Sequence, residues 1–129
     1  EMARKGVEVI LGADRDPRFG PLMMFGLGGT FVEVLKDVSF RLAPMKTIST
    51  HRMIRQIRSF KILTGVRGNP PSDIASIEEI LQRLSEMVVR HEEISEMDIN
   101  PLIVHKQGEG SSVADARMKL RKVKTANGK

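Results

Sequence analysis

The sequence contains no cysteine, no tryptophan and no tyrosine. Without cysteine it can form neither a disulfide framework nor a metal site or nucleophile built on a thiol. No apolar run approaches the roughly 20 residues that a membrane helix requires, and no signal peptide is visible. These absences lead us to expect a cytoplasmic protein that has no membrane partner.

The net charge and the aromatic content together limit the choice of partner. The 129 residues carry a formal net charge of +5, and much of it lies in the segment 117–129. Proteins that grip nucleic acid usually stack its bases on aromatic side chains, but only five phenylalanines are present. We therefore expect no nucleic-acid partner, whereas a basic surface still attracts an anionic nucleotide or coenzyme. The length fits one domain at most, and because residue 1 is not methionine we expect a piece of a longer protein.

The first third of the sequence predicts three strands. Apolar residues alternate along 6–16, as they do in a strand with one wet face. Two prolines and a glycine between 17 and 21 then predict a turn, and the apolar run 21–29 returns as the second strand of a hairpin. The segment 38–42 favours a third strand, which Pro44 ends.

Two helices are predicted in the middle of the chain. Apolar residues with basic residues between them recur at helical spacing in 49–63, where Ser49 or Thr50 would cap the helix. The clearest helical pattern runs through 72–91, and Asp73 stands at its start as a capping residue.

The final segment predicts a second hairpin. Polar and apolar residues alternate in EMDINPLIV (96–104), and the turn KQGEGSS (106–112) leads to one more strand. Hairpins at both ends of the chain, with helices between them, predict an α+β fold: a mainly antiparallel sheet with helices on one face.

Asn100 and Asp115 lie on the two strands of this second hairpin, where antiparallel pairing brings residues on either side of a turn together. Their amide and carboxylate oxygens are hard donors of the kind that Mg²⁺ takes in small number, with water and phosphate oxygens completing its shell. Asp98, two residues before Asn100, belongs to the same strand face. Spacing alone favours the plainer alternative, a solvated polar face of an edge hairpin.

The segment GLGGT (26–30) follows an apolar strand and offers backbone N–H groups to an anion. It lacks the spacing of a dinucleotide fingerprint and the lysine of a P-loop, so a tight turn is the commoner explanation. Glu33 behind it is either a capping carboxylate or a ligand. Glu8, on the polar face of the first strand, is by itself an ordinary solvated residue, as are residues 14–16. The three histidines show no metal-ligand spacing, and we assign none of them a catalytic role.

Several of these strings occur in an order that is similar to a known family. The stretches 6–45, LTGVRGNPPSD (63–73), EMDINPLIV (96–104) and VADARMKL (113–120) resemble the ATP-grasp domain of nucleoside-diphosphate-forming acyl-CoA synthetases, among them the ADP-forming acetate–CoA ligases. The resemblance covers about residues 6–120. It extends more distantly to the β subunit of succinyl-CoA synthetase, where a strand ending in INP and a later aspartate supply the metal site.

This resemblance implies a reaction and a set of site residues. Acyl-CoA, ADP and phosphate would interconvert with acid, CoA and ATP, and the phosphoryl group would travel through a phosphohistidine on a CoA-binding domain or subunit. Asn100 and Asp115 would hold Mg²⁺ against the phosphates of ATP or ADP. Asp98 would be the catalytic residue, facing the phosphohistidine.

The same resemblance implies four residues that contact the nucleotide. Glu8 would lie at a nucleotide-contacting strand position, and Gly28 and Gly29 would belong to a loop close to the phosphates. Arg117 would be a second phosphate contact.

The resemblance also implies what lies outside this chain. Residues 1–120 would be a partial ATP-grasp domain and 121–129 a basic tail, with the N-terminal part of the ATP-grasp domain supplied elsewhere. The further partners would be the CoA-binding domain or subunit, acyl-CoA or CoA, and a short carboxylic acid, so the chain alone would be inactive. The alternative function is a non-catalytic, regulatory synthetase-like domain of a protein acetyltransferase.

Overall fold

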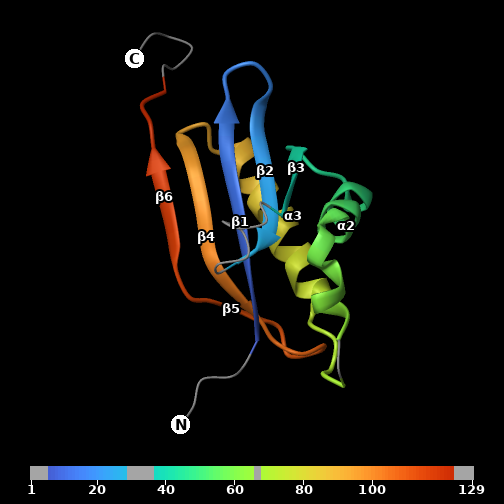
Figure 1. Ribbon diagram of the computed structural model, residues 1–129. Coiled ribbons are helices and arrows are strands. Elements are labelled where there is room, and N and C mark those ends of the chain that lie inside the picture. Colours follow the sequence, from blue (N-terminus) through green and yellow to red (C-terminus); the bar gives the residue numbers. More distant parts are fainter. Residues whose placement is uncertain (1–5, 29–36, 66–67, 124–129) are drawn as a thin grey trace.

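The computed structural model describes residues 6–28, 37–65 and 68–123, which form a six-stranded antiparallel sheet with helices on one face (Figure 1). The predicted α+β class is confirmed. The elements in chain order are β1 (Val7–Asp16), β2 (Gly20–Leu27), β3 (Val38–Leu42), α2 (Thr47–Gln56), the 3₁₀ helix η1 (Arg58–Thr64), α3 (Ile74–Arg90), β4 (Ile94–Val104), β5 (Ser111–Val113) and β6 (Ala116–Leu120).

The strands follow the order β3-β2-β1-β4-β5, and β6 pairs with β4 beside β5. β1 is therefore central, and the first and last parts of the chain meet where β1 pairs with β4. The predicted hairpin of β1 and β2 is confirmed, with Asp16 opposite Gly20. Gly20 has φ +87°, a conformation that favours glycine, and the Asp16 carboxylate accepts the Arg18 N–H at 2.7 Å inside the turn.

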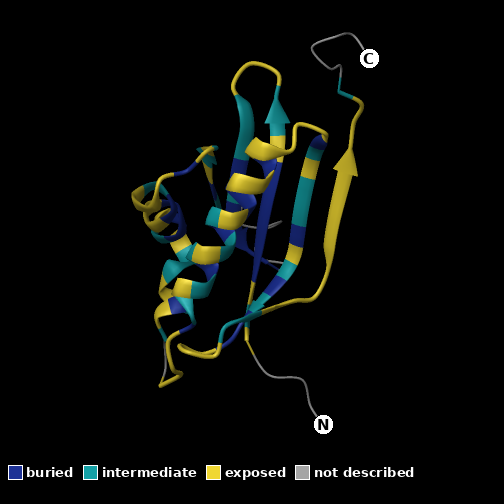
Figure 2. Cartoon of the chain, turned by 180° about the vertical axis from the view of Figure 1, so that it is seen from behind, coloured by how far each residue is buried: buried dark blue, intermediate teal, exposed yellow. Residues whose placement is uncertain are grey.

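The core lies between the sheet and the helices, as the burial colours show from behind (Figure 2). Alternate residues of β1 supply its floor: Val9 and Leu11 are fully buried and Ala13 nearly so. From α3, Ile77 and Leu81 face them at helical spacing and are fully buried. No helix in the described segments is long and apolar enough to cross a membrane.

The predicted helix over 49–63 differs from the structure at both ends. α2 begins at Thr47 with Lys46 at the capping position, and no side chain caps it, so the prediction of Ser49 or Thr50 as the cap is wrong. Thr50 lies inside the helix, buried, with its hydroxyl beside the Gln82 amide of α3. The helix ends at Gln56, and the next residue, Ile57, has an extended ψ of 147°. A separate 3₁₀ segment, η1, follows.

The predicted cap of the long helix is confirmed. Asp73 precedes α3, and its Oδ1 accepts the Ser76 N–H at 3.2 Å. Its Oδ2 accepts the Gly110 N–H at 2.7 Å, so the same carboxylate ties the turn between β4 and β5 to the start of the helix.

The last hairpin has a split return strand where a single one was predicted. β6 pairs with 94–99 and β5 with 102–104, and the break at Ala114 and Asp115 lies opposite Asn100 and Pro101. β4 also carries an extra residue there relative to β1, as in a β-bulge. Because proline has no N–H to donate, a regular ladder cannot continue through this point.

Candidate functional site

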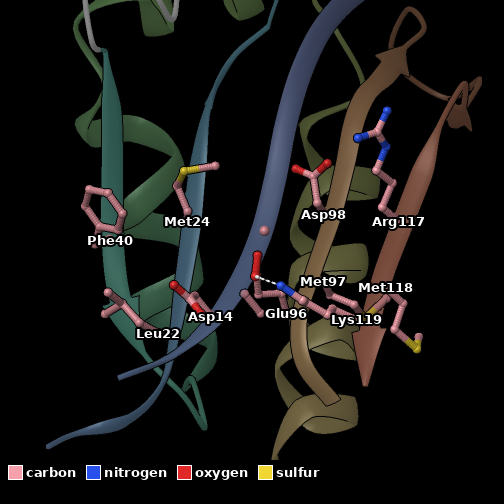
Figure 3. A pocket seen from close by; sticks show the side chains of 12 residues that line it. Asp14, Leu22, Met24, Phe40, Glu96, Met97, Asp98, Arg117, Met118 and Lys119 are labelled. Carbon is pink, nitrogen blue, oxygen red and sulfur yellow. Dashed lines mark ion pairs between the residues drawn. The ribbon is translucent and has the colours of Figure 1, made fainter. Parts of the chain in front are cut away.

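An open hollow lies on the sheet face opposite the helices (Figure 3). It has a volume of about 560 Å³. Its lining comes from every strand except β5: Gly12, Ala13, Asp14, Leu22, Met24, Phe40, Glu96, Met97, Asp98, Arg117, Met118 and Lys119. In Figure 3 the apolar side chains of β2 and β3 stand on one side of β1, and the charged side chains of β4 and β6 stand on the other.

The charged side of the hollow consists of two cross-strand pairs. Asp98 lies directly opposite Arg117 in the pairing of β4 with β6, and both side chains point into the hollow (Figure 3). Glu96 lies opposite Lys119, and the two charges form an ion pair of 3.9 Å. Opposite charges in direct cross-strand positions stabilise the pairing. They also place two carboxylates and two cations beside one space.

Asn100 and Asp115 meet at the bulge of β4. The Asn100 N–H donates to the Asp115 carbonyl oxygen at 3.0 Å, and the Ala114 N–H donates to the Pro101 carbonyl oxygen at 3.1 Å. The side chains of Asn100 and Asp115 are exposed, and the two residues lie next to the hollow rather than in its lining. The structure thus brings this predicted pair together through its backbone, two residues along β4 from Asp98.

Glu8 and Gly28 lie together farther along β1. The Gly28 N–H donates to the Glu8 carbonyl oxygen at 2.8 Å, and a Cβ atom at Gly28 would lie 3.3 Å from the backbone of Glu8. Glu8 is exposed, and it pairs with Ile103 on β4, beyond the bulge. Gly29 and Glu33 lie outside the described residues.

The described part of the chain contains no group of three or more His, Cys, Asp or Glu residues arranged to hold a metal ion. A site made of one amide and one carboxylate, as predicted for Asn100 and Asp115, does not need such a group, because water and phosphate oxygens complete the shell of Mg²⁺. The histidines take no part in the hollow: His51 lies 3.1 Å from Glu78 on the helical side, and His105 is buried with Nε2 2.8 Å from the Ser112 hydroxyl.

Among the residues that line the hollow, reasoning from the sequence gave a site role only to Asp98 and Arg117. Gly12 forms part of its floor, and Met24 and Phe40 form its apolar side. The alternation along β1 could have indicated Gly12, because Gly12 lies on the same strand face as Glu8. Nothing local signals Met24 or Phe40, because their place beside Gly12 depends on the pairing of β1 with β2 and of β2 with β3.

Comparison with curated proteins finds relatives of nearly half identical sequence. The acetate–CoA ligase [ADP-forming] I of Archaeoglobus fulgidus is 48% identical over 120 residues, which are 93% of this chain and 17% of that protein. The subunit beta of acetate–CoA ligase [ADP-forming] II of Pyrococcus furiosus is 46% identical over 121 residues, 93% of this chain and 51% of that subunit. The chain therefore spans about half of the length of the second relative and about a sixth of the first.

Solved structures share the fold closely. The dinucleotide-forming acetyl-coenzyme A synthetase 1 of Candidatus Korarchaeum cryptofilum, in complex with coenzyme A and Mg-AMPPCP and with its phosphohistidine segment pointing towards the nucleotide binding site, has a TM-score of 0.87 and 50% identity over 94% of this chain and 56% of that one. A Pyrococcus horikoshii protein has a TM-score of 0.88 and 42% identity over 95% of this chain and 52% of that one. The sequence matches the ATP-grasp domain family over residues 1–120. This chain is therefore a member of the ATP-grasp domain family.

Proposed function

We propose that this chain is the nucleotide- and magnesium-binding portion of an ADP-forming acyl-CoA synthetase. The whole enzyme would interconvert acyl-CoA, ADP and phosphate with a short carboxylic acid, CoA and ATP. The observation that carries the proposal is the group Asp98, Asn100 and Asp115, which β4 and the break before β6 bring together. The chain that holds this group is nearly half identical to ligases of that activity.

The donor set at the bulge fits a magnesium ion. Asn100 offers an amide oxygen and Asp115 a carboxylate, both on exposed side chains at adjoining backbone positions. Mg²⁺ is commonly held by one or two such protein oxygens together with substrate phosphates. When bound, the ion would neutralise charge on the phosphate oxygens, which is most of what phosphoryl transfer demands of a protein.

Asp98 would act on the histidine of the partner domain. Its carboxylate accepts the N–H of one imidazole nitrogen, while the other nitrogen carries the phosphoryl group. In transfer to ADP the N–P bond breaks and leaves its electron pair on the nitrogen, and a P–O bond forms to a β-phosphate oxygen. The nitrogen that is hydrogen-bonded to Asp98 keeps its proton throughout. The leaving group is therefore a neutral imidazole, and Asp98 holds it in place.

The other residues would position the nucleotide. Glu8 and Gly28 lie together past the bulge, where Glu8 offers a carboxylate and the missing side chain of Gly28 permits close approach. Arg117 stands beside Asp98, where its guanidinium offers several donors to phosphate oxygens. We keep Gly29 as a predicted phosphate contact.

The metal assignment is tested by Asp115→Ala in the full-length protein. Removing a charged ligand is expected to weaken MgADP binding by about 10- to 100-fold, equal to about 1.4–2.8 kcal/mol. ADP-dependent release of CoA from acyl-CoA should fall with it. Titration calorimetry with and without Mg²⁺ measures the first effect and a thiol assay the second.

Glu79→Ala is the matched control for this experiment. Glu79 is an exposed carboxylate on α3, in the opposite layer of the molecule, with a surface ion pair to Arg83 of 2.9 Å. It should change neither MgADP affinity nor CoA release. Unaltered turnover in Asp115→Ala would show that Asp115 is not a metal ligand.

A further inference from the structure

One row of residues crosses the open sheet face from end to end. Phe40 pairs with Met24, Met24 with Gly12, Gly12 with Asp98, and Asp98 with Arg117. Directly paired residues of an antiparallel sheet project to the same side, and all five line the hollow. We call this set the Gly12 row.

The Gly12 row has a gap at its centre. Gly12 is the one member without a side chain, and a Cβ atom added there would lie 3.3 Å from the Met97 carbonyl oxygen and 3.6 Å from the Met24 Cε. Met24 and Phe40 stand on one side of the gap, and Asp98 and Arg117 stand on the other (Figure 3). Any larger side chain at this position would project into the hollow.

The two sides of this gap differ in chemistry. A thioether and a phenyl ring offer polarisable contacts that suit the face or edge of another ring. A carboxylate on the opposite side accepts hydrogen bonds from an N–H group. The space therefore suits a small planar ring that is apolar on its face and carries N–H at its edge, and an imidazole has these properties.

The place of the row in the sheet decides which ring belongs there. Neighbouring rows on one sheet face lie about 7 Å apart, because two residues of a strand separate them. The row next to the Gly12 row contains Asn100 and Asp115, where the proposed function puts the metal and the terminal phosphates. This distance between rows has room for a phosphoryl group bound to the metal and for an attacking atom about 3–3.5 Å from its phosphorus. The adenine ring is held away from the terminal phosphate by the ribose and the other phosphates, so the ring in the gap must be the phosphoryl carrier.

We propose that Gly12 provides the space through which the histidine of the CoA-binding partner reaches Asp98, with Met24 and Phe40 as the apolar wall against the imidazole. Gly12 is thus a positioning residue that admits the carrier ring. This inference rests on the proposed function and adds to it a docking place for the histidine segment. The neighbouring pair Glu96 and Lys119 borders the hollow on the side away from Asn100 and Asp115.

The test uses Gly12→Leu and Gly12→Ala in the full-length protein with its CoA-binding partner. The phosphorylated partner is mixed with the variant and MgADP, and transfer of a radiolabelled phosphoryl group to ADP is followed in single turnovers. Displacement of the ring by about 1 Å or more should slow transfer by about 100-fold in Gly12→Leu. Gly12→Ala, with one methyl group in the same place, should lose about tenfold. MgADP affinity should be unchanged in both.

Ala116→Leu is the matched control, since it introduces the same leucine side chain into the same sheet on a different face. Ala116 is exposed and pairs with Ile99, whose side chain faces the helices. The Ala116→Leu variant should leave both the rate of phosphoryl transfer and the MgADP affinity unchanged. If Gly12→Leu does not fold, as judged by circular dichroism, Gly12→Ala decides the question.

The outcomes separate this inference from the proposed function. Transfer at the unmodified rate in both Gly12 variants overturns the inference alone. A loss of MgADP affinity that matches the loss of transfer also overturns it, because the nucleotide would then occupy the gap. If the unmodified protein neither binds MgADP nor accepts a phosphoryl group from the partner, the proposed function itself fails.

Discussion

The carboxylate of Asp37 is buried, and both of its oxygens accept hydrogen bonds. Asp37 precedes β3 and is 4% exposed, and its two oxygens accept the N–H groups of Arg58 at 2.6 Å and Ser59 at 2.8 Å. These N–H groups open η1 and have no partner within that helix. Burial alone would raise the pKa of Asp37, but hydrogen bonds from Ser59 and Arg58 and the charge of Arg58 outweigh burial and lower the pKa below 3.8.

The lowered pKa of Asp37 predicts a pH-dependent loss in Asp37→Asn. Since the folded pKa lies below the unfolded one, the carboxylate stabilises the protein fully above about pH 4 and loses this effect as the pH falls through the folded value. At pH 7 the substitution should lower the free energy of unfolding by about 1–2 kcal/mol. Urea denaturation at steps from pH 7 towards pH 2 should show the difference from the unmodified protein shrinking. Equal losses at every pH would contradict the assignment.

At the scale of elements, the C-terminal end of α3 is held by a side chain from the neighbouring sheet. Arg15 of β1 donates from Nε to the Ile94 carbonyl oxygen at 2.6 Å, and from Nη2 to the carbonyl oxygens of Val88 and His91. The last carbonyls of a helix lack partners and carry partial negative charge, so a guanidinium suits them. The expectation that residue 15 is an ordinary surface group is wrong.

Arg15→Met should therefore destabilise the junction of β1, α3 and β4. Losing charged hydrogen bonds to three carbonyls is expected to lower the free energy of unfolding by about 1.5–3 kcal/mol. Arg15→Lys should recover only part of this, because an ammonium lacks the planar fork of the guanidinium. Chemical denaturation measures both variants.

The control for this junction is Arg18→Met. Arg18 lies in the nearby turn with its side chain 78% exposed, so its replacement should change stability by less than about 0.5 kcal/mol. An Arg15→Lys variant as stable as the unmodified protein would mean that charge alone, without the fork, holds the end of α3.

The whole molecule has two layers, and one face of its sheet is left uncovered by the described residues (Figure 1). β1 lies between β2 and β4 with its core side chains buried. β6 lies at an edge, and all five of its residues are exposed. Stability should therefore fall from the centre of the sheet to the edge that supplies Asp115 and Arg117.

This gradient predicts the pattern of amide hydrogen exchange. The N–H groups of 9–13 in β1 should exchange slowest, because their release requires opening of the whole sheet. Those of 116–120 in β6 should exchange fastest among the strands. Exchange followed by NMR tests the order, and equal protection of β1 and β6 would mean that the edge opens only with the rest of the molecule.

The sequence by itself determined the features that depend on local pattern. Alternation predicted β1 and β4, an apolar run after turn residues predicted β2, and helical spacing predicted α3, with Asp73 as the capping residue at its start. The ordered strings were enough to identify the ATP-grasp resemblance, which the family match confirms. The roles of Asp98, Asn100 and Asp115 stay predictions, as does the end of the domain at Leu120.

Only the tertiary structure decided which distant residues share a space. The break at Ile57 and the burial of Asp37 depend on packing between β3, α2 and η1. The Gly12 row depends on the register of five strands, and a shift of one residue in any of them would turn its member to the other face of the sheet. The periodicity of a sequence indicates which face of a strand is exposed to solvent. It does not indicate which strand pairs with that strand, because the pairing of distant strands is set by the core that they bury together.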